Sequence, residues 1–187
     1  MPLLPPPRPR RLRSAVAGAL VSALAGVTAC GPGARLAEAT PPEALILSHE
    51  RQLRLGVADA ASDYLGAPYA YGAKGPRSFD CSGFTSHLLR EFGVALLGSS
   101  TSQAKQGRPV NPRRARPGDI AYFANERGRV NHVAVVVCNG PSGLEVVHAT
   151  TSRGVVRENV SRSSYWAPRL AGAREVVDVR QEFASAY

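Results

Sequence analysis

Three residues of the sequence carry side chains suited to nucleophilic catalysis: Cys81, His132 and His148. In such chemistry a thiolate attacks a carbonyl carbon, an imidazole takes and returns the proton, and a third polar group orients that imidazole. Each residue alone has an ordinary explanation, since buried cysteines are common and mostly inert. A cysteine at a helix start, followed by two histidines on adjacent strands, is much harder to explain by packing. The set predicts cysteine-dependent acyl transfer.

Cys81 lies at the start of a predicted helix, within Phe79-Asp80-Cys81-Ser82-Gly83-Phe84. Apolar residues recur behind it at helical spacing, and Gly93 marks the end of the helix. Asp80 suits the N-cap position, because its carboxylate can accept the free amides of the first turn. A helix N-terminus favours negative charge, so we expect the thiolate form of Cys81 to be stabilised there. A nearby cation should help, because the charge of Asp80 opposes that of the thiolate.

The two histidines fall on predicted neighbouring strands, near residues 130–138 and 144–149. A turn-rich stretch separates the strands and predicts a hairpin. A three-residue loop at Asn139-Gly140-Pro141, or a five-residue loop around it, sets His132 directly opposite His148. Directly opposed side chains have Cβ atoms about 4.5–5.5 Å apart, within reach of a hydrogen bond. This register is an assumption, because a slip of one residue would place the two rings on opposite faces.

Several short motifs occur in order along the chain and together carry a family resemblance. They are Gly66-Ala67-Pro68-Tyr69-Ala70-Tyr71-Gly72, the Phe79–Phe84 block, Arg116-Pro117-Gly118-Asp119-Ile120, Asn131-His132-Val133-Ala134, Val147-His148-Ala149 and Tyr165-Trp166-Ala167-Pro168-Arg169-Leu170. Across roughly residues 50–179 the chain resembles the NlpC-type family of papain-like cell-wall cysteine peptidases. The resemblance implies an α+β, papain-like domain over residues 49–179. Its antiparallel sheet of about five to six strands would pack against N-terminal helices.

The resemblance also implies a role for each matching residue. Cys81 would be the nucleophile, His132 the general base and later the acid, and His148 the group that orients His132. Tyr69 would help to hold the oxyanion, with a packing role as the alternative. Two further residues, Asp80 and Ser82, match positions that contact substrate amines in some members, although helix capping alone accounts for Asp80.

By the same resemblance, the reaction would be hydrolysis of amide bonds in peptidoglycan stem peptides through a thioester acyl-enzyme, without a metal or organic cofactor. The bonds would involve D-glutamate, diaminopimelate or D-alanine. Three departures from the family pattern concern substrate subsites: Asn131, a longer hairpin between the histidines, and Leu97-Gly98. An amidase or acyltransferase on the same triad, or an inactive wall-binding lipoprotein, are the alternatives.

The first 29 residues predict an export signal. Four arginines and several prolines are followed by a short, uncharged run of apolar and small residues, which is too short for a comfortable membrane span. The run ends Val27-Thr28-Ala29-Cys30, which resembles the lipobox of bacterial lipoproteins and implies lipidation of Cys30. An ordinary signal peptide or a signal anchor is the alternative. Because Gly31 rather than Asp follows, lipoprotein sorting implies the periplasmic face of the outer membrane, with a tether over residues 30–48.

The formal charge of +9 falls when the export signal is removed, leaving 19 basic and 14 acidic side chains. We therefore expect no nucleic-acid partner for the exported domain, and we expect a monomer.

The polar, arginine-rich stretch at residues 98–118 predicts a solvated loop, with a basic rim for an anionic ligand as the alternative. Cysteine spacing predicts no metal site. We expect Cys138 to be buried and beyond disulfide reach of Cys81, and His49 and His87 to be ordinary surface residues. Residues 180–187 are predicted to be a tail.

Overall fold

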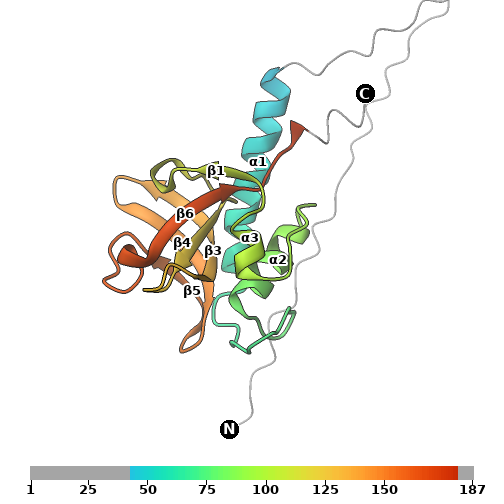
Figure 1. The fold of residues 1–187 in the computed structure, drawn as a ribbon. Helices are drawn as coiled ribbons and strands as arrows, with labels where there is room; N and C mark the ends of the chain where they lie inside the picture. Colours follow the sequence, from blue (N-terminus) through green and yellow to red (C-terminus); the bar gives the residue numbers. More distant parts are fainter. Residues whose placement is uncertain (1–42, 181–187) are drawn as a thin grey trace, which may run out of the picture.

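The computed structural model describes residues 43–180, and Figure 1 shows how their helices and strands are arranged. The predicted export signal, Cys30, the tether up to residue 42 and residues 181–187 lie outside the described residues. The elements in chain order are α1 (Glu43–Ser62), α2 (Cys81–Arg90), α3 (Ser100–Gln103), β1 (Arg108–Val110), the short 3₁₀ helix η1 (Pro112–Arg114), β2 (Ile120–Ala124), β3 (Val130–Gly140), β4 (Gly143–Thr150), β5 (Gly154–Asn159), the 3₁₀ helix η2 (Ala167–Arg169) and β6 (Leu170–Glu175). None of the described helices combines the length and the apolar composition needed to cross a membrane.

Six strands form one antiparallel sheet in the order β1-β6-β2-β3-β4-β5. Helices α1, α2 and α3 all contact β3 and lie on one side of the sheet (Figure 1). The predicted α+β fold and strand number are therefore confirmed. Strand β1 was not expected, because its Arg-Pro-Val sequence lies in the polar stretch; it forms by pairing with β6, where Arg108 lies opposite Glu175.

Alternating side chains of β3 separate two apolar clusters, as expected for a strand covered on both faces. Val133 and Val135 pack with the buried faces of α1 and α2, while Ala134 and Val136 join Phe123 in the second cluster. Fully burying a valine-sized side chain contributes about 1.5–3 kcal/mol relative to exposure. This double burial makes β3 the rigid element from which His132 projects.

A buried arginine fastens α1 to the sheet. Arg54 is 4% exposed, and its guanidinium donates to Asp119 at 2.7 Å and to Glu175 at 2.9 Å. It also donates to the backbone carbonyls of Pro117 and Val177. Helix α1 begins at Glu43, so residues 43–48, expected in the tether, are helical.

The β3–β4 hairpin differs from the predicted register. Gly140 pairs with Gly143, so the loop has two residues, and a bulge interrupts the ladder between Val136 and Cys138. Beyond the bulge Val135 lies opposite Val147, a shift of two residues from the prediction. The predicted register is therefore wrong, but a shift of two keeps side chains on the same face of the sheet. The two histidines remain neighbours on a diagonal.

Two smaller expectations are also wrong. Cys138 is exposed rather than buried, since it lies directly after the bulge, and it is a free cysteine, as is Cys81. His87 is not a surface residue: its ring packs against Tyr64 and Phe79 with centroids 5.5 and 5.3 Å apart, and burial lowers its pKa. His49 is exposed, as expected.

Candidate active site

The start of α2 holds Cys81 in place through a cap and a close loop contact. Asp80 has an extended backbone and accepts the Gly83 amide at 2.5 Å, so the predicted N-cap is confirmed. A Cβ atom on Gly83 would lie 2.1 Å from the carbonyl oxygen of Ala73. Only glycine therefore allows the 72–75 loop to pack against the first turn of α2, which explains the glycine two residues after the cysteine.

The Cys81 sulfur is half-buried and lies against β3. The backbone amides of Val133 and Ser82 face it and lower the pKa of the thiol, and Val133 directly follows His132 in the chain. Among residues 43–180 the Cys81 sulfur and the His132 ring form no hydrogen bond with each other. Burial raises the pKa of the Cys81 thiol and outweighs both amides, so the resting group is a neutral thiol. This differs from the thiolate expected at a helix start.

Lys74 is the cation expected beside Asp80. Its ammonium lies 3.0 Å from Asp80 Oδ2, 2.9 Å from Ser82 Oγ and 3.0 Å from the Gly98 carbonyl oxygen. Burial alone would raise the pKa of Asp80, but the Gly83 amide and Lys74 hold it below its usual value. Lys74 also acts on Cys81, where its charge lowers the pKa of the thiol. The sequence predicted a cation near Asp80 and Cys81 but did not identify Lys74 as the residue that supplies it.

The two histidines form a direct hydrogen bond on the sheet. His132 Nε2 lies 2.9 Å from His148 Nδ1, and His148 is fully buried. The other ring nitrogen of His148 lies 3.3 Å from Glu158 Oε2, and Glu158 accepts from Arg153 at 2.5 Å. These side chains form a linear series of hydrogen bonds. Within the described residues, no group of three or more His, Cys, Asp or Glu side chains could hold a metal ion. Glu158 was missed by the sequence analysis.

Both imidazoles are neutral at pH 7. Burial lowers the pKa of His132 to about 3, with a further contribution from neighbouring His148. Burial lowers the pKa of His148 to about 4, although Glu158 partly opposes the shift. A neutral imidazole can act as a general base toward a neutral thiol, because it has a lone pair free to accept the thiol proton.

Trp166 covers the histidine pair. Its ring stacks on His132 with centroids 4.6 Å apart and an interplanar angle of 27°, and it meets His148 edge-on at 5.0 Å. Phe123 lies beside both His132 and Trp166. The tryptophan therefore removes water from one face of the base, in keeping with the low pKa of His132. The motif that contains Trp166 contributes to the family resemblance, but the sequence did not predict the contact of Trp166 with the two histidines.

A family model described as the NlpC/P60 family matches residues 66–175, more than half of the chain. This chain belongs to the NlpC/P60 family. It is 31% identical over 141 residues to the probable endopeptidase NlpC of Escherichia coli (strain K12), covering 74% of this chain and 88% of that protein. It is 34% identical over 147 residues to the gamma-DL-glutamyl hydrolase of Bacillus subtilis (strain 168), covering 76% of this chain but 32% of that protein.

This chain also matches the probable endopeptidases p60 of Listeria grayi, Listeria seeligeri and Listeria welshimeri, but it spans only 20% of the length of each. Among solved structures, an NlpC/P60 family protein from Bacillus cereus superposes with a TM-score of 0.59 at 26% identity. That match covers 65% of this chain and 39% of the other. The fold described above is thus the fold of the family.

The remaining predicted residues of the NlpC/P60 site lie around Cys81. Tyr69 bridges to Phe79 just before the helix, and the pKa of its hydroxyl is raised by burial and then by Cys81. Asp80 and Ser82 are buried, and the Ser82 hydroxyl donates to Asp80 at 2.9 Å. Because Lys74 contacts both, a substrate amine would have to displace that ammonium to reach them.

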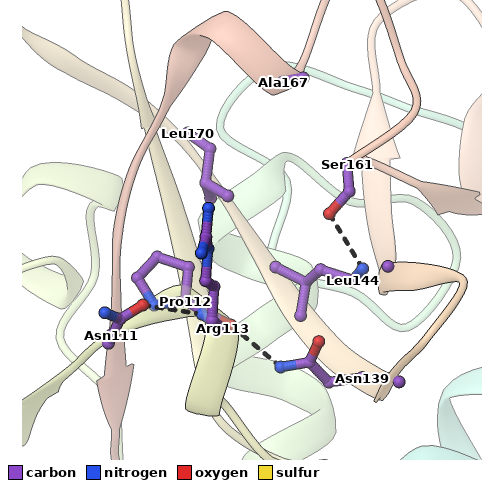
Figure 2. Close-up of a pocket in the computed structure, with 10 residues that line it drawn as sticks. Asn111, Pro112, Arg113, Asn139, Leu144, Ser161, Ala167 and Leu170 are labelled. Atoms are coloured by element: carbon purple, nitrogen blue, oxygen red, sulfur yellow. Dashed lines mark hydrogen bonds between the residues drawn. The ribbon is translucent and has the colours of Figure 1, made fainter.

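A hollow of about 590 Å³ lies elsewhere on this NlpC/P60 domain. Figure 2 shows its lining side chains, among them Arg113, Asn139, Ser161 and Leu170. Asn139 donates to the Pro112 carbonyl at 3.0 Å, so this amide supports the η1 loop. Cys81, His132 and His148 do not line the hollow. The hollow is therefore separate from Cys81 and the histidine pair.

Proposed function

We propose that this chain is a cysteine peptidase that hydrolyses amide bonds in peptidoglycan stem peptides. The observation that carries the proposal is the 2.9 Å hydrogen bond between His132 and His148, next to Val133, whose backbone amide lowers the pKa of the Cys81 thiol. The relatives named as endopeptidases and as a gamma-DL-glutamyl hydrolase favour the same reaction. The bond cleaved would be of the D-glutamyl–diaminopimelate type or a diaminopimelate/D-alanine cross-link.

In the proposed reaction His132 Nδ1 takes the thiol proton as the Cys81 sulfur attacks the scissile carbonyl. Nδ1 is the available nitrogen because Nε2 is bonded to His148. The Cys81 amide and the Tyr69 hydroxyl would stabilise the oxyanion. Collapse of the tetrahedral intermediate breaks the C–N bond, and the proton passes from His132 to the leaving amine. Water, activated by the same imidazole, then hydrolyses the thioester and releases the carboxylate.

Digestion of defined muropeptides in H₂¹⁸O, with mass spectrometry of the products, tests this proposal. We expect cleavage within the stem peptide, one ¹⁸O atom in the new carboxylate, and no product with Cys81→Ala. Release of intact stem peptide from the glycan would instead identify an amidase, and attachment of an added amine an acyltransferase. Absence of any product, or cleavage that survives Cys81→Ala, would refute the proposal.

We also propose that the protein is a lipid-anchored monomer at the periplasmic face of the outer membrane, which brings the domain to its wall substrate. The support is the lipobox-like Val27-Thr28-Ala29-Cys30 followed by Gly31. Metabolic labelling with radioactive palmitate should mark the protein but not Cys30→Ser, and membrane fractionation should place it with the outer membrane. Light scattering of the solubilised protein should give one chain per particle. If palmitate does not label the wild-type protein, the lipid anchor is refuted, and the protein is either secreted or held by a signal anchor.

A further inference from the structure

We propose that Glu158 is a positioning residue that selects the tautomers of both catalytic histidines, so that His132 presents an unprotonated Nδ1 to Cys81. This inference rests on the proposed function and deepens it, since neither the sequence motifs nor the relatives' names assign Glu158 a role.

The direction of each hydrogen bond in the chain follows from Glu158. An ionised carboxylate only accepts hydrogen bonds, so the contact at 3.3 Å requires the proton on His148 Nε2. A neutral His148 then has a bare Nδ1, which can only accept. His132 Nε2 must therefore carry the proton in the 2.9 Å bond, and its Nδ1 is left free. The opposite tautomers would leave His132 unable to accept a thiol proton at Nδ1.

The charge state required for this selection is supported by the surroundings. Glu158 accepts from Arg153 at 2.5 Å, and although burial would raise its pKa, Arg153 keeps the pKa of Glu158 below its usual value. Neutral His148 follows from its complete burial. Carboxylates that hold a functional imidazole in one orientation and tautomer act in the same way at metal sites.

Stability alone does not account for this ion pair. The side chains of Glu158 and Arg153 are 21% and 52% exposed, and pairs of this kind contribute about 0–1 kcal/mol. Glu158 lies on β5 and Arg153 in the turn before it, and a second pair, Glu145 of β4 with Arg157 of β5, has a distance of 2.7 Å with side chains 26% and 48% exposed. That pair has similar geometry but does not contact a histidine. It is a matched control for every effect of losing an ion pair on β4 and β5.

The test compares Glu158→Gln, Glu158→Ala and the control Glu145→Gln in protein labelled with ¹⁵N-histidine. Ring ¹⁵N chemical shifts at pH 7, assigned with His132→Asn and His148→Asn, report which nitrogen carries each proton. The wild type and Glu145→Gln should show both histidines protonated at Nε2. Glu158→Gln, whose amide can donate to His148 Nε2, and Glu158→Ala should show a mixture with Nδ1–H on His148. We expect kcat on a muropeptide to fall about 10–100-fold in both, the range for lost outer partners of functional groups, with KM nearly unchanged.

Wild-type protein with Nδ1–H on either histidine would overturn the inference, as would Glu158→Gln that matches Glu145→Gln in both tautomers and kcat. If Glu158→Ala does not fold, the near-isosteric Glu158→Gln decides alone. Wild-type protein that cleaves no muropeptide, but whose tautomers are as stated and shift in Glu158→Gln, would refute the proposed function and leave the tautomer assignment standing.

Discussion

The Trp166 indole lies nearly parallel to the His132 imidazole, with ring centroids 4.6 Å apart. This contact places an apolar ring where water would otherwise solvate a protonated base. The same indole reaches His148, so one side chain covers both members of the hydrogen-bonded pair. The burial that lowers the pKa of His132 thus includes a contact from the 163–169 segment.

Replacing Trp166 by alanine should therefore raise the pKa of His132 toward the ordinary histidine value. Activity would then be lost at a higher pH on acidification, because the base becomes protonated earlier. Trp166→Phe keeps a stacking ring and should shift the pKa less. NMR titration of the His132 ring and the acid limb of kcat/KM measure both effects. An unchanged titration in Trp166→Ala would show that the stack does not set the pKa.

The raised pKa of Cys81 predicts how its thiol reacts with iodoacetamide. Below the pKa the thiolate fraction, and hence the alkylation rate, should rise about tenfold per pH unit across pH 6.5–8.5. The measurement uses Cys30→Ser/Cys138→Ser protein, since Cys138 is exposed and free. A rate that is already constant below pH 7 would instead reveal a thiolate–imidazolium pair between Cys81 and His132.

Lys74 should influence the same reaction through its charge. Lys74→Met keeps the length of the side chain but leaves Asp80 unneutralised, so the pKa of Cys81 should rise and alkylation at pH 7.5 should slow several-fold. Lys74→Arg retains a cation and should react nearly as the wild type does. Equal rates in Lys74→Met and the wild type would show that Lys74 serves only the helix cap.

Folding stability should fall on mild acidification. The pKa values of His132 and His148 are about 3 and about 4 in the folded protein, below the usual 6.5, so the unfolded chain binds more protons in this range. Their contribution is complete above about pH 6.5 and is lost as the pH falls toward the folded values. Thermal unfolding followed by circular dichroism should give a Tm that drops between pH 7 and 5. In His132→Asn/His148→Asn the drop should be smaller, and an equal drop would assign it to other groups.

Local signals accounted for the elements that carry the candidate site. Asp80 capped α2 as predicted, and the hairpin predicted between the two histidine-bearing strands placed both histidines on one sheet face. The exact pairing was not predictable, because a bulge after Val136 and a two-residue turn together moved the register by two. Both histidines still lie on the predicted face of the sheet, because side chains of a strand alternate between the two faces with a period of two residues.

The groups missed by the sequence analysis act through contacts that only the folded chain creates. Lys74 and Glu158 are ordinary polar residues in their local sequence, and their significance comes from what tertiary packing sets beside them. The charge state of Cys81 was misjudged for a related reason. A helix N-terminus and burial act in opposite directions on a thiol, and the extent of burial cannot be deduced from sequence spacing.

Because Gly83 has no side chain, the electrostatic surroundings of Cys81 depend on how the 72–75 loop packs. The Ala73 carbonyl fills the space in which any larger residue would place its first carbon, and Lys74 is the next residue of that loop. A methyl group at position 83 would force the backbone at Ala73 and Lys74 to shift. Gly83→Ala should therefore disturb the contact between Lys74 and Asp80 even though both charged residues are still present. The absence of one carbon atom at position 83 thus helps to set the pKa of the neighbouring Cys81 thiol, through the position of Lys74.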